Sequence, residues 1–304
     1  MKTAHPLCSL VLGLCATVLL VSAPAQAKRK LKVYISVDME GVVGAVTEQQ
    51  LGPKGFEYQR FREFMTNETN AAIKAAYDAG ATEILVSDSH GNGQNLLIER
   101  LPASVQVVRS WPRPLMMMQG MDATFDAAIF LGYHTSTSAL HGVRAHTLSS
   151  ARLAEVRLNG VAMSEASLNA AVAGHFNVPV VLISGDDATV NEARSVIGPV
   201  EGAVVKWAYS FHSARSLTPQ AAYKLIGRKV RSALRRLDEF RPYKPRAPLQ
   251  LDVRFKNYRP AQVLALLPIV DRTDSHSIRY RATNVLEVFR FLEFMLSYNA
   301  DLAP

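Results

Sequence analysis

A strand–helix–strand pattern near the start of the chain limits the folds that the protein can adopt. Lys32–Ser36 is a β-branched and aromatic run typical of a buried strand, and Glu83–Ser87 is another. Between them, Tyr58–Ala79 has apolar residues at helical spacing and stops at Gly80, a residue suited to a helix C-cap. Such a unit is expected to be parallel and right-handed. The pattern therefore predicts an α/β fold, with a mostly parallel sheet flanked by helices.

Later segments repeat these signals over the 304 residues, 48% of which are hydrophobic. Further strands are expected at Val105–Val108, Asp126–Leu131, Val178–Ser184, Val204–Trp207 and Leu249–Phe255. Helices are expected at 164–173, 187–196, 219–240, 260–266 and 284–297, with a hairpin turn at Asn159-Gly160. Prolines at 242, 245 and 248 predict a stiff linker. The residues after about 200 are expected to form a smaller C-terminal α+β region used for assembly.

The first residues have the features of a secretory signal. A short basic start is followed by the apolar run Leu10–Val21, which is too short for a relaxed membrane span. Ala25-Gln26-Ala27 supplies a small-x-small cleavage pattern. We expect residues 1–27 to be a signal peptide cleaved near Ala27, which leaves no membrane span in the mature chain. The alternative is that this segment is kept as an N-terminal anchor.

Both cysteines of the chain, Cys8 and Cys15, lie within that signal. A mature chain without cysteine excludes disulfides, thiolate metal sites and a cysteine nucleophile. Any metal site would then be built from His, Asp and Glu. An exported, cysteine-free protein fits a periplasmic or envelope location.

The net charge of +8 is concentrated in the basic segment Arg228–Arg246. Such a run can indicate nucleic-acid binding. An exported chain without a nucleic-acid motif argues against that partner, and we interpret the run as a solvated helix face. Attraction to an anionic envelope surface is the alternative.

Three of the expected strands end at polar residues, which would meet at one edge of the sheet. The first ends at Asp38 and Glu40, the second at Asp88 and His90, and the strand 126–131 leads to His134. Two neighbouring carboxylates repel each other when buried, and a divalent cation between them removes that cost. A solvated acidic turn is the alternative interpretation for the first strand end.

A fifth metal-capable group, Glu165, lies in the first turn of a helix that Ser164 is expected to cap. The predicted metal ligands are therefore Asp38, Glu40, His90, His134 and Glu165. Two adjacent metal ions about 3.5–4 Å apart could bind there and activate a water molecule.

Four motifs resemble those of the zinc D-aminopeptidases, a self-compartmentalising bacterial peptidase family. They are Ser36-Val37-Asp38-Met39-Glu40-Gly41, Asp88-Ser89-His90, Leu131-Gly132-Tyr133-His134 and Gly142-Val143-Arg144-Ala145-His146. The likeness runs from about Lys30 to the last helix. It implies two zinc ions per subunit, held by the five predicted ligands with Asp38 bridging, and a catalytic role for His146. It also implies a homo-oligomer, such as a decameric ring.

The resemblance leads to a functional expectation. We expect an exported metallo-aminopeptidase that hydrolyses short peptides or amides with an N-terminal D-amino acid such as D-Ala, through a dinuclear zinc centre and a metal-activated water. Residues 28–200 would form the metal-binding catalytic α/β domain, and residues 201–304 the smaller region. The substrate's free amino group needs an anionic partner or a metal, and Asp88 and Asp186 are candidates for the former, although either could instead brace a turn.

Other functions remain open at this stage. The chain could be an exported peptide- or muropeptide-binding protein with a metal pocket but no turnover. It could also be a structural ring in which zinc holds the subunits together. His146 could be a structural histidine, and the same donors also suit manganese, cobalt or iron.

Overall fold

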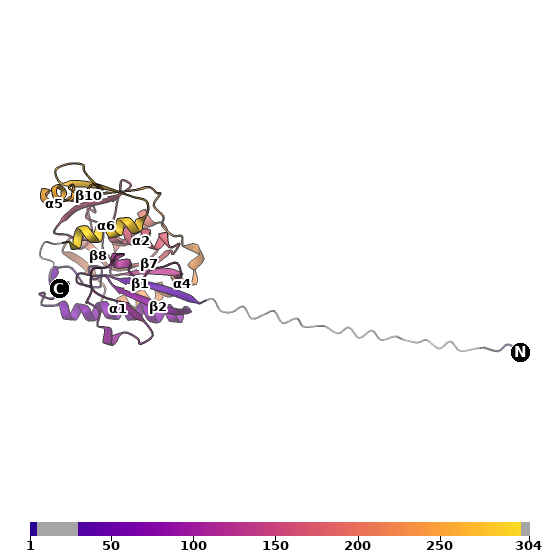
Figure 1. Ribbon diagram of the computed structural model, residues 1–304. Helices are drawn as coiled ribbons and strands as arrows, with labels where there is room; N and C mark the ends of the chain where they lie inside the picture. The colour runs from indigo at the N-terminus through magenta and orange to yellow at the C-terminus, as the bar shows by residue number, and fades with distance from the viewer. Residues whose placement is uncertain (5–29, 299–304) are drawn as a thin grey trace.

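The computed structural model describes residues 1–4 and 30–298, so the predicted signal peptide lies almost entirely outside the described residues. A seven-stranded sheet forms the centre of the molecule, in the order β3-β2-β1-β4-β7-β8-β9 (Figure 1). Its strands are β1 (Leu31–Val37), β2 (Ala81–Asp88), β3 (Gln106–Val108), β4 (Ala127–Leu131), β7 (Val180–Asp186), β8 (Glu201–Ser210) and β9 (Ser213–Ser216). All neighbouring pairs are parallel except β8 and β9. The predicted α/β class is confirmed.

Strand β1 lies between β2 and β4, and the register places the three strand ends side by side. Val37, the last residue of β1, is level with Asp88 of β2 and with Leu131 of β4. The next residue, Asp38, continues the ladder because its N–H donates to the carbonyl of Leu131 at 2.8 Å. Both faces of β1 are covered, which explains its nearly continuous apolar sequence.

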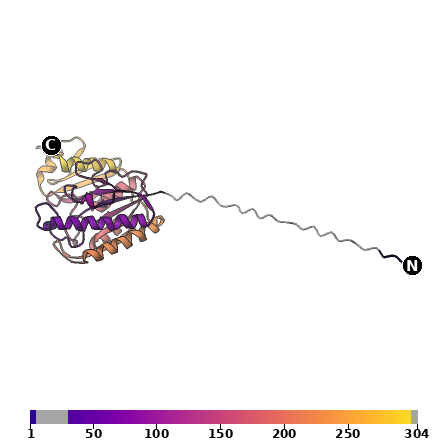
Figure 2. The same cartoon turned by 90° about the horizontal axis from the view of Figure 1, so that it is seen from below.

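Two helices cover one face of this sheet. α1 (Tyr58–Asp78) and α4 (Pro219–Arg235) lie side by side there (Figure 2). Their buried side chains, including Met65 and Ile226, pack with Val33 and Ile35 of β1 in one apolar cluster. The basic residues of α4 lie mostly on its outer side, as expected for a solvated helix face.

The opposite face carries a second layer of helices and then a second sheet (Figure 1). The helices are α2 (Glu165–His175), α3 (Asp187–Ile197) and α6 (Val285–Ser297). The second sheet has the order β11-β12-β10-β5-β6 and is antiparallel. Its strands are β5 (Leu153–Leu158), β6 (Val161–Ala162), β10 (Leu249–Phe255), β11 (Val270–Arg272) and β12 (Ser277–Ala282), with α5 (Tyr258–Leu264) packed beside them.

The boundary expected near residue 200 does not separate the two sheets. β8, β9 and α4 follow that position but belong to the layers of the first sheet, whereas β5 and β6 precede it and belong to the second. The reason is that β5 pairs with β10, a strand far along the chain, and local patterns do not reveal such pairing. Strand β8 is also longer than expected, because its second half pairs with β9.

Within the described part of the chain, no helix combines the length and the apolar character that a membrane crossing requires.

Candidate metal centre

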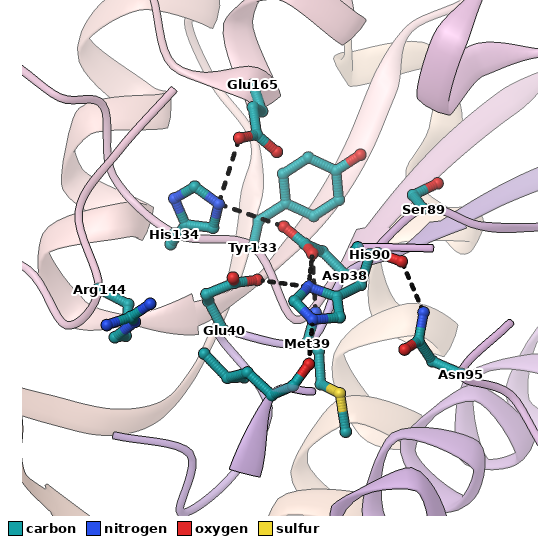
Figure 3. Close-up of polar contacts among 12 residues, drawn as sticks. Asp38, Met39, Glu40, Ser89, His90, Asn95, Tyr133, His134, Arg144 and Glu165 are labelled. Atoms are coloured by element: carbon teal, nitrogen blue, oxygen red, sulfur yellow. Dashed lines mark hydrogen bonds and ion pairs between the residues drawn. The ribbon is translucent and has the colours of Figure 1, made fainter. Parts of the chain in front are cut away.

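The structure brings the five predicted ligands to one place at the carboxyl ends of the central strands (Figure 3). Asp38 and Glu40 follow β1, His90 follows β2, and His134 follows β4. Glu165 is the first residue of α2, whose N-cap is Ser164 as expected. The five side chains point toward one another although they come from four separate stretches of the chain. All of them are at most 7% exposed.

Possible ligand atoms within 4.8 Å of one another form three overlapping groups. The groups are Asp38 with Glu40 and His90, Asp38 with His134 and Glu165, and Glu40 with His134 and His146. Asp38, Glu40 and His134 each belong to two of the three groups, and Asp38 is the residue shared by the two groups that consist of predicted ligands alone. This is the arrangement that a carboxylate bridging two cations requires.

The ring of His90 presents a lone pair to two carboxylates. Its Nε2 lies 2.7 Å from the carbonyl oxygen of Leu51, and a carbonyl can only accept, so this nitrogen carries a hydrogen. Its Nδ1 lies 2.9 Å from Oε2 of Glu40 and 3.2 Å from Oδ1 of Asp38. That nitrogen therefore either binds a cation that the carboxylates share or carries a second proton that it donates to them.

His134 is arranged in the same way but with the opposite nitrogen. Its Nδ1 donates to the carbonyl of Thr135 at 3.0 Å. The Nε2 atom then faces Oδ2 of Asp38 at 3.3 Å and Oε1 of Glu165 at 3.4 Å. Backbone carbonyls that fix the tautomer of a histidine are a common feature of metal sites.

His146 stacks on His134, with ring centroids 4.1 Å apart and planes inclined by 9°. Its Nδ1 lies 2.7 Å from the carbonyl oxygen of Arg144 and therefore donates to it. The remaining nitrogen, Nε2, lies 3.8 Å from Oε1 of Glu165. His146 thus turns a lone pair toward the same cluster while its side chain stays 13% exposed.

The buried polar atoms fit a pair of cations. Oδ2 of Asp38 and Nε2 of His134 lack a hydrogen-bond partner within the described part of the chain. Burial, together with the charge of Glu40, raises the pKa of Asp38. Burial alone would lower the pKa of His90, but the carboxylates of Glu40 and Asp38 outweigh it and hold that pKa well above its usual range. Without metal, protons on the imidazoles supply the positive charge that the carboxylates need.

A cavity of about 300 Å³ opens onto the cluster. The five predicted ligands and His146 line it on one side. Its other walls include Trp111, Met116, Met117, Leu148, Leu296 and Glu293. A small organic molecule can therefore reach the cluster through a space that has both apolar and polar walls.

Comparison with known proteins identifies the family. The D-aminopeptidase model of peptidase family M55 matches residues 31–294. The chain belongs to this family. A D-aminopeptidase of Bacillus subtilis (strain 168) is 34% identical over 266 residues, which are 87% of this chain and 96% of the relative. This chain is also similar to the solved structure of the Zn-dependent D-aminopeptidase DppA from Bacillus subtilis, which is described as a self-compartmentalizing protease. The TM-score is 0.85 and the sequence identity 32%, and the match covers 90% of this chain and 100% of that chain.

The resemblance that the four motifs indicated is thus confirmed, and the chain is a metallopeptidase of the D-aminopeptidase family. Metallopeptidases need a bound cation, a water molecule within its reach and a group that moves protons. The convergent carboxylates and imidazoles of this family member, with His146 beside them, provide residues of the types that this chemistry uses.

Lys206 supports the site but was not found by sequence reasoning. It is fully buried, and its Nζ donates to the backbone carbonyls of Glu40, Val42 and Ala45. Burial lowers its pKa to about 8. The ammonium group therefore holds the segment after β1 in the bend that directs Glu40 into the cluster. A lone lysine within the apolar run of β8 was the signal available in the sequence.

Glu68 of α1 supports the same segment from the other side. Its Oε1 accepts a hydrogen bond from the N–H of Val43 at 2.9 Å. Burial raises the pKa of Glu68 to about 7. Together, Glu68 and Lys206 satisfy backbone groups of a loop that carries a predicted ligand and has no regular structure of its own.

Asp88 and Asp186, the two candidates for binding the substrate's amino group, have a structural role instead. Asp88 accepts hydrogen bonds from the backbone N–H groups of Asn95 and Leu96 at 2.6 and 2.7 Å. Asp186 caps α3 and accepts from the N–H of Val143 at 2.7 Å. Their carboxylates brace turns, which was the alternative interpretation.

Proposed function

We propose that this chain is an exported, zinc-dependent D-aminopeptidase that removes an N-terminal D-amino acid, such as D-Ala, from short peptides or amides. The observation that carries the proposal is the position of Asp38, shared by two groups of metal-capable atoms at the base of an accessible cavity. Membership of the D-aminopeptidase family supports the reaction class.

Two zinc ions per subunit would be held by the predicted ligands. Asp38, Glu40 and His90 would hold one ion, and Asp38, His134 and Glu165 the other. Zinc bound there supplies a Lewis acid for the scissile carbonyl and lowers the pKa of a water molecule to about 7. In each of the two histidines the other ring nitrogen donates to a backbone carbonyl, so the nitrogen that faces the carboxylates is the one that would lose its proton and bind zinc.

His146 would move the protons of the reaction. Its Nδ1–H is held by the carbonyl of Arg144, so Nε2 is free to accept a proton from the attacking water. The same nitrogen can then deliver the proton to the leaving amine. Stacking on His134 fixes the plane of the ring, and the cavity leaves Nε2 within reach of a substrate. The apolar side chains of Met116 and Met117 would pack against the substrate and exclude bulk water.

The test is a metal analysis combined with a substrate screen on the purified chain. We expect close to two zinc ions per subunit by elemental analysis. Turnover should be faster on D-alaninamide than on L-alaninamide and should be lost with a chelator. Tight peptide binding without products would instead support the capture protein. An assembly that falls apart with chelator, without ever showing turnover, would support the structural ring.

Export of the chain is part of the proposal. Its support is the sequence alone, namely the apolar run followed by Ala25-Gln26-Ala27. Fractionation of a Gram-negative host that expresses the full chain should place the protein in the periplasm, with an N-terminus near Lys28. Retention of the whole sequence in the cytoplasm would contradict export but not the proposed reaction.

A further inference from the structure

The proposed reaction requires recognition of a free amino group, which is an ammonium ion at neutral pH. An ammonium ion that leaves water for a cavity needs an anionic or strongly polar partner. Asp88 and Asp186 accept backbone N–H groups and cap turns, so their carboxylates are already occupied. The carboxylates of the metal cluster face imidazoles. Another acidic group must therefore be sought on the walls of the same cavity.

Glu293 is the carboxylate that remains. It lies on α6, a helix of the layer between the two sheets, and it lines the cavity that the five predicted ligands and His146 also line. Glu293 is 9% exposed although its neighbours Leu292 and Phe294 are apolar. A lone acid in an apolar helix segment is costly to bury, and its orientation toward the cavity is what keeps the charge partly solvated.

The hydrogen bonds of Glu293 leave room for a ligand. Its Oε1 accepts from the hydroxyl of Ser297 at 2.7 Å, one turn further along α6. Within the described residues, no hydrogen bond to the other oxygen and no ion pair of Glu293 is found, and the guanidinium of Arg113 acts on Glu293 only electrostatically. The nearby Arg152 directs its guanidinium to the carbonyl of Leu296 instead, at 2.8 Å. The cavity thus holds a buried negative charge without a bonded cation of its own.

We propose that Glu293 binds the α-ammonium group of the substrate and so selects peptides with a free N-terminus. This inference rests on the proposed function, since it names the group that recognises the substrate of that reaction. The ammonium would lie between Glu293 and the cluster, with the scissile carbonyl on the cluster side. Substrates without a free amine, such as N-acylated peptides, would leave the carboxylate unpaired and bind poorly. The other possibility is that the amine binds at the metal cluster itself, in which case Glu293 contributes nothing to selection.

The test compares two inhibitors that differ only in the amino group. D-alanine hydroxamate and propionohydroxamate carry the same metal-binding group, but only the first has an amine. Their inhibition constants are measured on the zinc-loaded wild-type chain and on Glu293→Gln, a change that keeps the shape and can still accept from Ser297. A charged hydrogen bond of this kind is expected to change affinity about ten- to hundredfold.

The wild type should bind D-alanine hydroxamate more tightly than propionohydroxamate. We expect the ratio of these two inhibition constants to fall about ten- to hundredfold in Glu293→Gln. The inhibition constant of propionohydroxamate should stay within about twofold, because removing a charge that it does not touch leaves its contacts intact. The KM for D-alaninamide should rise while zinc content is unchanged. Glu287→Gln, on the same helix but outside the cavity, is the matched control and should behave as the wild type.

The outcomes separate this inference from the proposed function. If the wild type binds zinc and hydrolyses D-alaninamide but Glu293→Gln keeps the full preference, the ammonium binds elsewhere and the inference is wrong. Equal weakening of both inhibitors would assign Glu293 a structural role and also overturn it. If the wild type shows neither turnover nor preference, the proposed function itself fails. Should Glu293→Gln not fold, Glu293→Ala takes its place because it also removes the carboxylate, and an unchanged preference in that variant overturns the inference.

Discussion

Each of the three histidines at the cluster has one ring nitrogen committed to a backbone carbonyl. Leu51 accepts from His90, Thr135 from His134 and Arg144 from His146. In His90 and His134 the second nitrogen faces carboxylates at 2.9 to 3.4 Å, so it either binds a cation or carries an extra proton. Opposite these nitrogens lie carboxylates, whose charges raise the pKa of His90 and His134 well above the usual value despite burial. Protons and metal ions therefore compete for the same nitrogens.

This competition predicts that zinc binding releases protons. Because the pKa values of His90 and His134 are raised, both imidazoles are protonated at neutral pH without metal, and each must lose its proton to become a ligand. Affinity for zinc should therefore weaken as the pH falls. Isothermal titration calorimetry in buffers of different ionisation enthalpy should find up to about two protons released per subunit near pH 7. Binding that is independent of pH and releases no proton would contradict this account of the site.

His146 should matter for turnover more than for metal binding. We expect His146→Ala to keep its zinc and to lower kcat by about 10²- to 10⁴-fold, the usual contribution of a general acid–base group. KM should change much less, since the walls of the cavity remain. Steady-state kinetics and elemental analysis on the same sample measure both effects, with the exposed His175→Ala as control. A variant with full kcat would reduce His146 to a structural residue.

At the scale of elements, the site depends on how closely the ends of β1 and β4 approach. The N–H of Gly41 donates to the carbonyl of Gly132 at 2.7 Å. A Cβ atom added at Gly41 would lie 2.0 Å from the carbonyl oxygen of Tyr133, a contact that the backbone must move to avoid. Gly41 is thus required because two backbones meet there, and their approach places Asp38 beside His134.

Gly41→Ala should therefore damage both stability and the metal site. We expect the free energy of unfolding to fall by about 3 kcal/mol, as for severe overpacking, and the zinc content to fall with it. Gly160→Ala is the control, because Gly160 has a positive φ of 80° but open space around it. That change should cost about 1 kcal/mol and leave the zinc content unchanged. Denaturant unfolding measures the stability of the two variants, and elemental analysis measures their zinc content. Equal zinc loss in both variants would contradict a specific effect of Gly41 on the metal site.

For the whole molecule, α5, the end of α6 and the neighbouring part of the second sheet form an apolar groove beside the cavity of the metal cluster. Val263, Leu266, Phe294 and Tyr298 are between 43% and 81% exposed and line a groove of about 470 Å³. Large exposed apolar patches commonly mark contacts between proteins. The structural relative is described as a self-compartmentalizing protease, and on that basis we expect a second copy of this chain to cover the groove.

We expect the wild-type chain to be a homo-oligomer in solution, up to the decameric ring suggested by the resemblance. Leu266→Glu places a charge on the exposed groove and should lower the assembled mass, as measured by multi-angle light scattering. Circular dichroism should be unchanged because Leu266 is 81% exposed. The charge change Glu99→Gln, at an exposed position that does not line the groove, is the control and should keep the assembled mass. A monomeric wild type, or an assembly indifferent to Leu266→Glu, would contradict this assignment.

Much of the site was predictable because its parts are local. Hydrophobic runs of strand length predicted β1, β2 and β4, and the polar residues after them follow directly in the chain. Parallel strands joined by helices must end on the same edge, so Asp38, His90 and His134 could be placed together without a structure. Glu165 was predictable from its helix cap, although its approach to His134 depends on how α2 packs.

The sequence by itself determined the elements, their parallel order and the types of side chain at the strand ends, because these follow from periodicity and chain direction. Only the tertiary structure decided that β5 joins β10 in a second sheet, that Lys206 holds the loop of Glu40, and that Glu293 faces the cavity. Pairing between distant strands and the burial of single charges depend on the packing of segments far apart in the chain. No pattern within one segment carries that information.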